Sequence, residues 1–262
     1  MREYIREAIL NFFRKRSKLA EKLIADAGGW QWIEIVHQNR PSGWLDKLFW
    51  KRKEVQASRT KLELVKKRLR ELIEECKSER VKIIDLGCGS GRDIIETLSG
   101  LAGTTEIQVI CIDSDPKALA KGKELAENEG VADKILFQEA DLHRVIEEAI
   151  RDGNKYDIVM AVGILEFIEN ATEFLIRIGN VIAPHGTILT THIRKTLGPL
   201  PALLNKSFGI WCPIYRDREE LEEILKNVFE EVTIEYEPKK VYSIAIGKRF
   251  KGNPHTDFLN QR

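Results

Sequence analysis

The spacing of hydrophobic positions along the chain changes at about residue 80. Before that point, apolar side chains recur every three or four residues, which predicts helices that each bury one face. After it, short apolar runs alternate with amphipathic stretches, as strands alternate with helices. We therefore expect a helical cap over residues 1–80, an α/β domain over residues 81–248 and a tail over residues 249–262.

The second region predicts a parallel sheet with helices on both faces. The predicted strands are residues 81–86, 107–112, 134–139, 156–162, 187–192, 231–236 and 241–247, and the predicted helices are residues 92–101, 116–129, 142–151, 171–181 and 218–228. Only Glu237 to Lys240 separate the last two strands. So short a link cannot cross over the sheet, so these strands must form an antiparallel hairpin. The predicted fold class is α/β: a doubly wound, mostly parallel seven-stranded sheet that ends in this hairpin.

The cap contains an aromatic segment, in which Trp44, Phe49 and Trp50 lie close together. A basic amphipathic helix with such residues can lie on a membrane surface. A buried interface suits them better, because aromatic side chains supply large apolar areas. We expect the apolar stripe of the cap to pack on the α/β domain, where the cap could close over an active site.

Charge is distributed unevenly, although the formal net charge is only +1. Residues 1–80 hold 20 Lys and Arg against 12 Asp and Glu, a balance of +8, and the remainder has a balance of −7. A basic front end can attract an acidic substrate, a nucleic acid or a lipid surface. Both signs are interleaved along residues 51–80, which favours solvated helix faces instead.

The four cysteines, Cys76, Cys88, Cys111 and Cys212, show no C-x-x-C spacing, so the sequence predicts no metal site. Cys88 and Cys111 fall in apolar strand contexts, where a free thiol behaves as a small hydrophobe. We expect a reducing, cytoplasmic compartment. No stretch reaches the roughly 20 apolar residues that span a bilayer, and residues 1–20 are too charged for a signal peptide.

The strongest chemical signal is the segment Asp85-Leu86-Gly87-Cys88-Gly89-Ser90-Gly91, which lies where a predicted strand becomes a helix. Glycines there permit a tight turn and bring a ligand close to the backbone. The N-terminus of the next helix offers free N–H groups to a carboxylate or a phosphate. A glycine-rich turn needed only for packing is the alternative, but the preceding strand and the nearby acidic residues favour a ligand.

Asp113 ends the second predicted strand, where a carboxylate can accept hydrogen bonds from both hydroxyls of a ribose. A helix N-cap is the alternative, but Asp115 stands directly before Pro116 and suits the cap better. Asp141, after the third strand, can accept from an exocyclic amine such as that of adenine. It can equally cap the helix that follows, and one residue could serve both roles.

The fourth predicted strand opens into a loop at Gly163. Residues 161–167 should line a pocket, because ligands of open α/β sheets lie beyond the carboxyl ends of the strands. Glu166 is a candidate catalytic base or acceptor anchor, with a solvated loop residue as the alternative. His192 ends the fifth strand and is a second candidate base, with a structural hydrogen-bonding role as the alternative.

In this order, these features resemble class I S-adenosylmethionine-dependent methyltransferases over about residues 81–248. The resemblance implies S-adenosylmethionine as the cofactor, held by Asp85, Gly87, Cys88, Gly89, Gly91, Asp113, Ser114, Asp141, Leu142 and Gly163. It implies that the glycine loop holds the methionine part, that Asp113 holds the ribose and that Asp141 lies beside the adenine. Sheets of this family also end in an antiparallel hairpin.

A narrower likeness is to a family of bacterial methyltransferases with a helical N-terminal region. It rests on Asn39-Arg40-Pro41, on the segment that reaches Leu62-Glu63, on residues 163–167 and on residues 215–221. One position departs from it, since Leu165 stands where an aromatic residue is expected. The departure bears on contacts with the methyl acceptor and leaves the cofactor residues unaffected.

We therefore expect an enzyme that moves the methyl group of S-adenosylmethionine to a small-molecule acceptor. Its main task is to hold two reactants in line and exclude water. Long loops in compact domains often cover binding sites, so residues 194–215, with Trp211, and Trp50 of the cap are expected to shape the acceptor site.

Three other functions stay open. One is an RNA methyltransferase guided by the basic cap; no Asn/Asp-Pro-Pro-aromatic tetrad and no RNA-binding module is present, so nucleic acid ranks below small molecules. A second is a nicotinamide-dependent Rossmann-type oxidoreductase, whose fingerprint would place the third glycine at Arg92 instead of Gly91. The third is a module that binds S-adenosylmethionine without turnover.

Overall fold

The structure is a computed structural model that describes residues 2–25, 29–76, 78–101, 105–194 and 214–252. Its strands are β1 (Arg80–Leu86), β2 (Glu106–Asp113), β3 (Ile135–Glu139), β4 (Tyr156–Ala161), β5 (Ile182–Ile193), β6 (Phe229–Tyr236) and β7 (Tyr242–Phe250). The strands form one sheet with the order β3-β2-β1-β4-β5-β7-β6. Strands β1 to β5 run parallel to their neighbours, and β7 is antiparallel to both β5 and β6. The predicted seven-stranded sheet with its terminal hairpin is confirmed.

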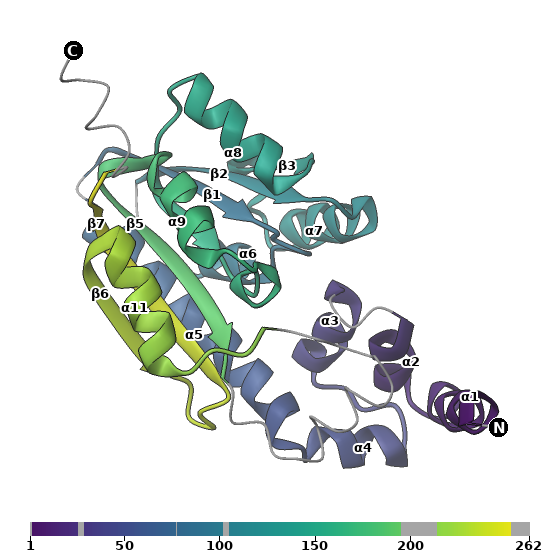
Figure 1. The fold of residues 1–262 in the computed structure, drawn as a ribbon. Helices are drawn as coiled ribbons and strands as arrows, with labels where there is room; N and C mark the ends of the chain where they lie inside the picture. The colour runs from purple at the N-terminus through teal and green to yellow at the C-terminus, as the bar shows by residue number, and fades with distance from the viewer. Residues whose placement is uncertain (1, 26–28, 77, 102–104, 195–213, 253–262) are drawn as a thin grey trace.

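Helices precede the sheet and cover both of its faces (Figure 1). Before the sheet come α1 (Arg2–Arg14), α2 (Lys18–Ala25), α3 (Trp30–Gln38), α4 (Trp44–Trp50) and α5 (Lys53–Glu75). Between the strands come α6 (Arg92–Ser99), α7 (Pro116–Asn128), α8 (Leu142–Arg151), α9 (Ala171–Gly179) and α11 (Arg218–Val228), with short 3-10 turns η1 (Ala132–Lys134) and η2 (Leu165–Phe167). Helices α1 to α4 extend beyond one end of the sheet, whereas α5 runs alongside it (Figure 1).

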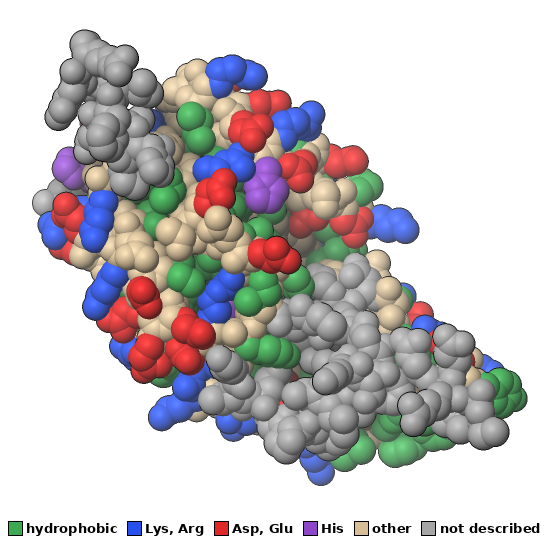
Figure 2. Space-filling model, viewed as in Figure 1, with side chains coloured by type: hydrophobic (Ala, Val, Ile, Leu, Met, Phe, Trp, Pro, Cys, Tyr) green, Lys and Arg blue, Asp and Glu red, His purple; other side chains and the backbone are tan. Residues whose placement is uncertain are grey.

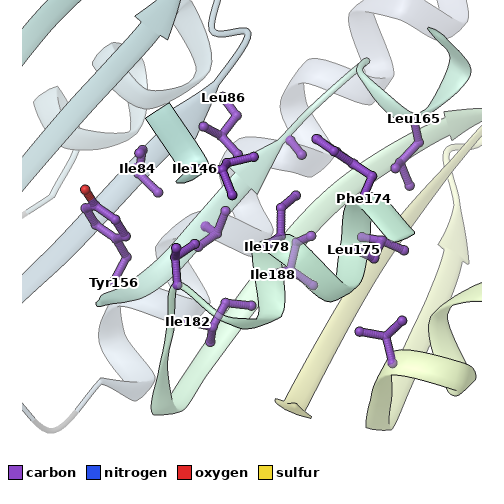
Figure 3. Close-up of a cluster of buried hydrophobic side chains, with 14 of the residues drawn as sticks. Ile84, Leu86, Ile146, Tyr156, Leu165, Phe174, Leu175, Ile178, Ile182 and Ile188 are labelled. Carbon is purple, nitrogen blue, oxygen red and sulfur yellow. The ribbon is translucent and has the colours of Figure 1, made fainter. Parts of the chain in front are cut away.

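Two hydrophobic clusters hold the helices on the sheet. In the first, side chains of β1, α8 and α9 meet, among them Leu86, Ile146 and Phe174 (Figure 3). The second cluster lies on the other face, where α5 and α6 pack on β1. Leu69 of α5 and Ile94 of α6 are both fully buried there. Burial of side chains of this size stabilises the fold by roughly 1.5–3 kcal/mol each, so α5 is a structural part of the core.

The observed elements differ most from the predicted ones in two places, β5 and the N-terminal helices, and elsewhere by a few residues at their ends. Strand β5 begins at Ile182 instead of Thr187, because residues 184–186 look like a turn in the sequence but form a bulge, where the pairing with β4 shifts register. The N-terminal apolar pattern forms two helices, with Ser17 at the break, where its Oγ accepts from Ala20 N at 2.9 Å. Phe12 of α1 keeps 44% of its surface exposed.

Charged side chains of both signs lie on the visible surface of the sheet domain (Figure 2). In the view of Figure 2, Lys and Arg side chains are mixed with Asp and Glu side chains over the sheet domain. None of the helices within the described ranges combines the length and the apolar character that a membrane span requires. Cys76, Cys88 and Cys111 are free thiols, and the cytoplasmic location stays a prediction.

Candidate active site

A cavity of about 420 Å³ lies beyond the carboxyl ends of β1, β2 and β4. Its wall comes from α3 and α5 of the N-terminal region and from the loops that follow these strands and β3. The residues that line it are Gly29, Trp30, Trp32, Ile33, His37, Ser58, Lys61, Leu62, Val65, Asp85, Gly87, Cys88, Gly89, Ser90, Arg92, Asp93, Ile112, Asp113, Ser114, Asp115, Ala140, Asp141, Leu142, Val162, Gly163, Ile164, Glu166, Phe167 and Tyr242. The structure thus brings together all the predicted cofactor residues except Gly91.

The glycine loop forms one wall of this cavity. Gly87 and Gly89 have φ angles of +67° and +57°, a conformation that L side chains rarely adopt. Gly91 is also left-handed but is buried behind the loop, where an added Cβ would lie 3.5 Å from Cys111 Sγ and from the ring of Phe137. An added Cβ would thus meet the cavity residue Ile164 at Gly87 and the cavity residue Trp30 at Gly89, whereas at Gly91 it would make only ordinary contacts behind the loop.

Asp113 ties the end of β2 to the glycine loop. Its Oδ2 accepts from Gly89 N at 2.7 Å and its Oδ1 accepts from Asp115 N at 2.9 Å. Each carboxylate oxygen can accept a further hydrogen bond, so the predicted ribose contact stays open to Asp113. Asp115 caps α7 through Lys117 N at 2.8 Å, as predicted, and Asp141 caps α8 through Arg144 N at 3.0 Å.

Asp85 places a buried carboxylate at the cavity wall. Only 1% of its surface is exposed, and its Oδ2 has no hydrogen-bond partner in the described part of the chain. Burial, with Asp93 and Asp113 nearby, raises the pKa of Asp85 well above its ordinary value. A bound cation would satisfy Oδ2 and offset the repulsion among these carboxylates.

Trp30 at the start of α3 covers the glycine loop, a contact that the sequence did not predict. Its indole Nε1 donates to Asp115 Oδ2 at 2.8 Å. Its Cβ lies 3.2 Å from the position that a Cβ on Gly89 would occupy. The N-terminal helices therefore contact the same two loops that carry the predicted cofactor residues.

An ionic network fixes α3 over the site. The guanidinium of Arg92 in α6 binds both carboxylate oxygens of Glu34, through Nε at 2.9 Å and through Nη2, and Glu96 at 2.6 Å. Lys66 of α5 binds Glu96 at 2.7 Å. Burial disfavours the charge of Glu34, but Arg92 outweighs it and holds the pKa of Glu34 below its ordinary value. The network joins α3, α5 and α6.

Glu166 on η2 reaches the cavity, as predicted. It is 3% exposed, and its Oε2 has no hydrogen-bond partner among the described residues. Burial raises its pKa above the ordinary value, and Lys61 and Arg216 act against that shift. A carboxylate with a raised pKa and an unoccupied oxygen can take up a proton from a bound molecule.

His192 lies behind Glu166 and does not line the cavity. Its Nδ1 is 3.9 Å from Glu166 Oε2, and its Nε2 accepts from Arg216 N at 3.1 Å. Burial, together with Arg216, lowers the pKa of His192 to about 4. A neutral imidazole whose acceptor nitrogen is occupied carries its proton on Nδ1. The geometry therefore favours the structural alternative for His192 over its predicted role as a base.

Arg216 holds the loop that carries Glu166. Its Nη1 donates to Leu165 O at 2.8 Å and its Nη2 donates to Ile168 O at 2.7 Å. Directly after it, Asp217 and Glu220 form a capping box at the start of α11. The segment of residues 215–221, which the sequence pointed to only through a family likeness, thus holds the loop of Glu166 and begins α11.

Lys61 is a buried cation that the sequence analysis missed. It lies on the buried stripe of α5 and is 8% exposed. Its Nζ is 4.7 Å from the centre of the Tyr242 ring on β7. The signal for Lys61 was its place one turn before Val65 in an otherwise apolar stripe.

Trp50, one of the two tryptophans predicted to shape the acceptor site, is not found there. Trp50 does not line the cavity; it packs with the small cluster of Leu19, Val36 and Val55, and its Nε1 donates to Asn39 Oδ1 at 3.0 Å. Trp30 and Trp32 of α3 occupy the wall instead. Trp211, with the rest of residues 195–213, lies outside the described residues.

Comparison with known proteins gives the class to which this fold and site belong. Residues 77–245, more than half of the chain, match the model of a family described as a methyltransferase domain. The chain belongs to this family, and its cofactor is S-adenosylmethionine. The nicotinamide-dependent alternative is not favoured.

Individual relatives are more distant. An uncharacterized protein of Synechococcus is 31% identical over 109 residues, which cover 42% of this chain and 24% of that protein. A ubiquinone biosynthesis O-methyltransferase of Rickettsia felis is 28% identical over 117 residues, which cover 45% of this chain and 43% of the relative. The chain thus spans less than half the length of these curated relatives.

Solved structures share the fold at low sequence identity. A Bordetella parapertussis protein named a possible exported protein superposes with a TM-score of 0.74 at 17% identity, over 92% of this chain and 86% of that one. The magnesium protoporphyrin IX methyltransferase of Synechocystis, solved with bound S-adenosylhomocysteine, gives a TM-score of 0.57 at 15% identity, over 82% of this chain and 92% of that one. These likenesses establish a methyltransferase fold.

Proposed function

We propose that the protein methylates a small-molecule acceptor bound in the cavity between α3, α5 and the carboxyl edge of the sheet. The observation that carries the proposal is that one cavity of about 420 Å³ is lined both by the glycine loop and by the buried Glu166. Sites for small molecules have volumes of about 300–1,000 Å³. A donor and an acceptor that share this cavity would lie next to each other.

The residues of the first half of the cavity fit the cofactor. Gly87 and Gly89 present backbone without side chains to the cavity, which suits the methionine part, and the partnerless Oδ2 of Asp85 suits its ammonium group. Asp113 offers its remaining acceptor positions to the ribose, and we assign Asp141, which also lines the cavity, to the adenine. When bound, S-adenosylmethionine supplies an electrophilic methyl group on a sulfonium.

Glu166 supplies the base that a hydroxyl acceptor requires, because such an acceptor must lose its proton on methylation. Its carboxylate accepts the proton, and His192 and Arg216 position it from behind. Trp30, Trp32 and Ile164 line the same cavity with apolar surface, which excludes water from the acceptor.

The likeness to ubiquinone biosynthesis O-methyltransferases supports a small acceptor that is methylated on oxygen. The enclosing helices support it as well, since the ion-paired α3 lies over the glycine loop. RNA methylation has less support, because the sequence contains no Asn/Asp-Pro-Pro-aromatic tetrad. A module that binds the cofactor without turnover would not need a buried, partnerless carboxylate at Glu166.

Calorimetric titration with S-adenosylmethionine tests the cofactor half of the proposal. Asp113→Asn should weaken binding about ten- to hundredfold, since it removes a charged hydrogen-bond acceptor. Asp133→Asn, a change of the same kind at an exposed position, should leave the affinity unchanged. Equal affinity of both variants would contradict the role of Asp113, and absence of binding by the unaltered protein would contradict the proposal itself.

Turnover is tested by release of S-adenosylhomocysteine in a screen of small hydroxylated acceptors. Glu166→Gln should abolish most of that release and leave the affinity for S-adenosylmethionine within about twofold. Full turnover by Glu166→Gln would remove the proton-accepting role of this residue.

A further inference from the structure

The cavity wall is rich in carboxylates and contains few cations. Its acidic residues are Asp85, Asp93, Asp113, Asp115, Asp141 and Glu166. Its two cationic residues are Arg92, whose guanidinium is bound by Glu34 and Glu96, and Lys61. Lys61 has no carboxylate within ion-pair distance among the residues that the structure describes. It is the cavity cation left without an ion partner in that part of the chain.

The surroundings of Lys61 come from β7 and η2 and, on the side of the glycine loop, from Asp93 of α6. The ring of Tyr242 lies 4.7 Å from its Nζ, and Glu166 and Asp93 are the carboxylates that interact with its charge. His37, also in the wall, has a buried Nε2 without a partner among the described residues. Burial and the charges of Lys61 and Arg92 lower the pKa of His37 to about 4, so it adds no positive charge near neutral pH.

The sheet order separates two halves of the cavity. In the order β3-β2-β1-β4-β5-β7-β6, the loops after β1, β2 and β3 carry the glycine loop, Asp113 and Asp141. Glu166 follows β4, and Tyr242 begins β7, on the other side of β1. Lys61 contacts this second half.

A buried ammonium without an ion partner is unfavourable for folding. Loss of solvent lowers the pKa of Lys61, although Glu166 and Asp93 act in the opposite direction. Replacement of a buried charge by an apolar side chain of similar length is commonly neutral or stabilising. A ligand oxyanion would satisfy this ammonium, as it does in charge-assisted hydrogen bonds.

We propose, on the basis of the function proposed above, that Lys61 binds an oxyanion of the methyl acceptor, so that the acceptors of this enzyme are small organic acids. Lys61 is then a specificity-determining residue presented by α5, with the Tyr242 ring beside it and Glu166 at the site of proton removal. The group of the acceptor that Lys61 binds is a negatively charged oxygen, either of a carboxylate or of an ionised hydroxyl.

The test measures binding of acid and amide pairs to the full chain saturated with S-adenosylhomocysteine. Benzoate and 2-naphthoate are titrated against benzamide and 2-naphthamide by calorimetry, with 4-nitrophenol above and below its own pKa as the hydroxyl arm. The variants are Lys61→Met, Lys61→Arg and Lys67→Met, the last removing an exposed positive charge from the same helix. Affinity for S-adenosylhomocysteine and the melting temperature are recorded for every variant.

The proposal expects an acid to bind about ten- to hundredfold more tightly than its amide. This preference should vanish in Lys61→Met, persist in Lys61→Arg and persist in Lys67→Met, while Lys61→Met melts at or above the temperature of the unaltered protein. Tighter binding of the nitrophenolate alone would assign the ionised hydroxyl as the negative group.

Three outcomes overturn the proposal. If neither the acids nor the nitrophenolate bind more tightly than their neutral forms, Lys61 is not an anion site, and the proposed function stands. If Lys61→Met weakens S-adenosylhomocysteine and leaves the acid preference intact, Lys61 belongs to the cofactor site. If the unaltered protein does not bind S-adenosylhomocysteine, the proposed function fails and this proposal with it.

Discussion

Substitution of Gly87 by alanine tests whether the glycine loop is shaped for a ligand or only for a turn. Gly87 has a φ of +67°, and an added Cβ would lie 3.1 Å from Ile164 Cγ1 and closer still to Ile164 Cδ1. The left-handed conformation costs an alanine about 1–2 kcal/mol. Displacement of the Ile164 side chain adds about 1–3 kcal/mol, because carbon atoms are normally 3.5–4.0 Å apart. Gly87→Ala should therefore destabilise the protein by about 2–5 kcal/mol.

Gly153 provides the matched control. Its φ is +71°, but nothing lies within 4 Å of an added Cβ, so Gly153→Ala should cost only the conformational part, about 1–2 kcal/mol. Ile164→Val removes the Cδ1 atom that would meet the new methyl group. In the double variant Gly87→Ala/Ile164→Val, about 1–2 kcal/mol of the loss should be recovered relative to the sum of the single effects.

The assay is urea unfolding of the four variants and the unaltered protein, with calorimetric titration of S-adenosylmethionine alongside. Gly87→Ala places a methyl group in the cavity, so it should also weaken cofactor binding at least tenfold, whereas Gly153→Ala should leave it unchanged. Equal destabilisation by Gly87→Ala and Gly153→Ala, with unchanged cofactor affinity for both, would refute the assigned contact and the place of the loop in the site.

Two further predictions follow from the cap and from the buried histidine. Trp30→Phe keeps an aromatic ring, smaller than the indole, and removes the bond from Nε1 to Asp115, so it should lower stability by about 1 kcal/mol and weaken S-adenosylmethionine binding. Trp44→Phe makes the same change at an exposed position and should do neither, so equal effects would argue against the contact. The pKa of His192 is about 4 in the folded protein and about 6.5 in the unfolded chain. Between these two pH values the unfolded chain binds a proton that the folded protein does not. The contribution of His192 to the free energy of unfolding, about 3 kcal/mol, is therefore lost as the pH falls from about 6.5 to 4. His192→Gln should flatten this part of the curve of unfolding free energy against pH, whereas a change at the exposed His185 should leave its shape unaltered; a curve that falls as steeply in His192→Gln would assign the loss to other groups.

Local sequence patterns predicted most of the sheet domain because its elements obey local rules. The two-residue and 3.6-residue periods locate strands and helices, and Asp115 before Pro116 identifies the start of α7 directly. The hairpin followed from a link too short to cross over. Strand β5 was shortened in the prediction because Pro184 and Gly186 give a turn signal, and only pairing with β4 reveals that they lie in a bulge.

The cofactor wall was predictable for the same reason, since Asp85, Asp113 and Asp141 lie at or just after the carboxyl ends of strands. The acceptor wall was predictable only at Glu166, because the rest of it is assembled across the fold. Lys61, Glu166 and Tyr242 come from α5, η2 and β7, and no local rule links them. His192 was assigned correctly to a strand end, but which of its nitrogens is occupied depends on Arg216, a residue 24 positions away.

Helix α5 links the choice of acceptor to the stability of the whole domain. Its first turns carry Lys61 into the cavity, whereas its later turns carry Leu69 and Ile73 into the core beneath the sheet. Natural variation that alters the acceptor through this helix is therefore confined to its N-terminal half. Exchange of N-terminal segments between relatives would preserve both tasks only if the junction falls ahead of Lys53, so that the helix is inherited in one piece with the sheet it supports.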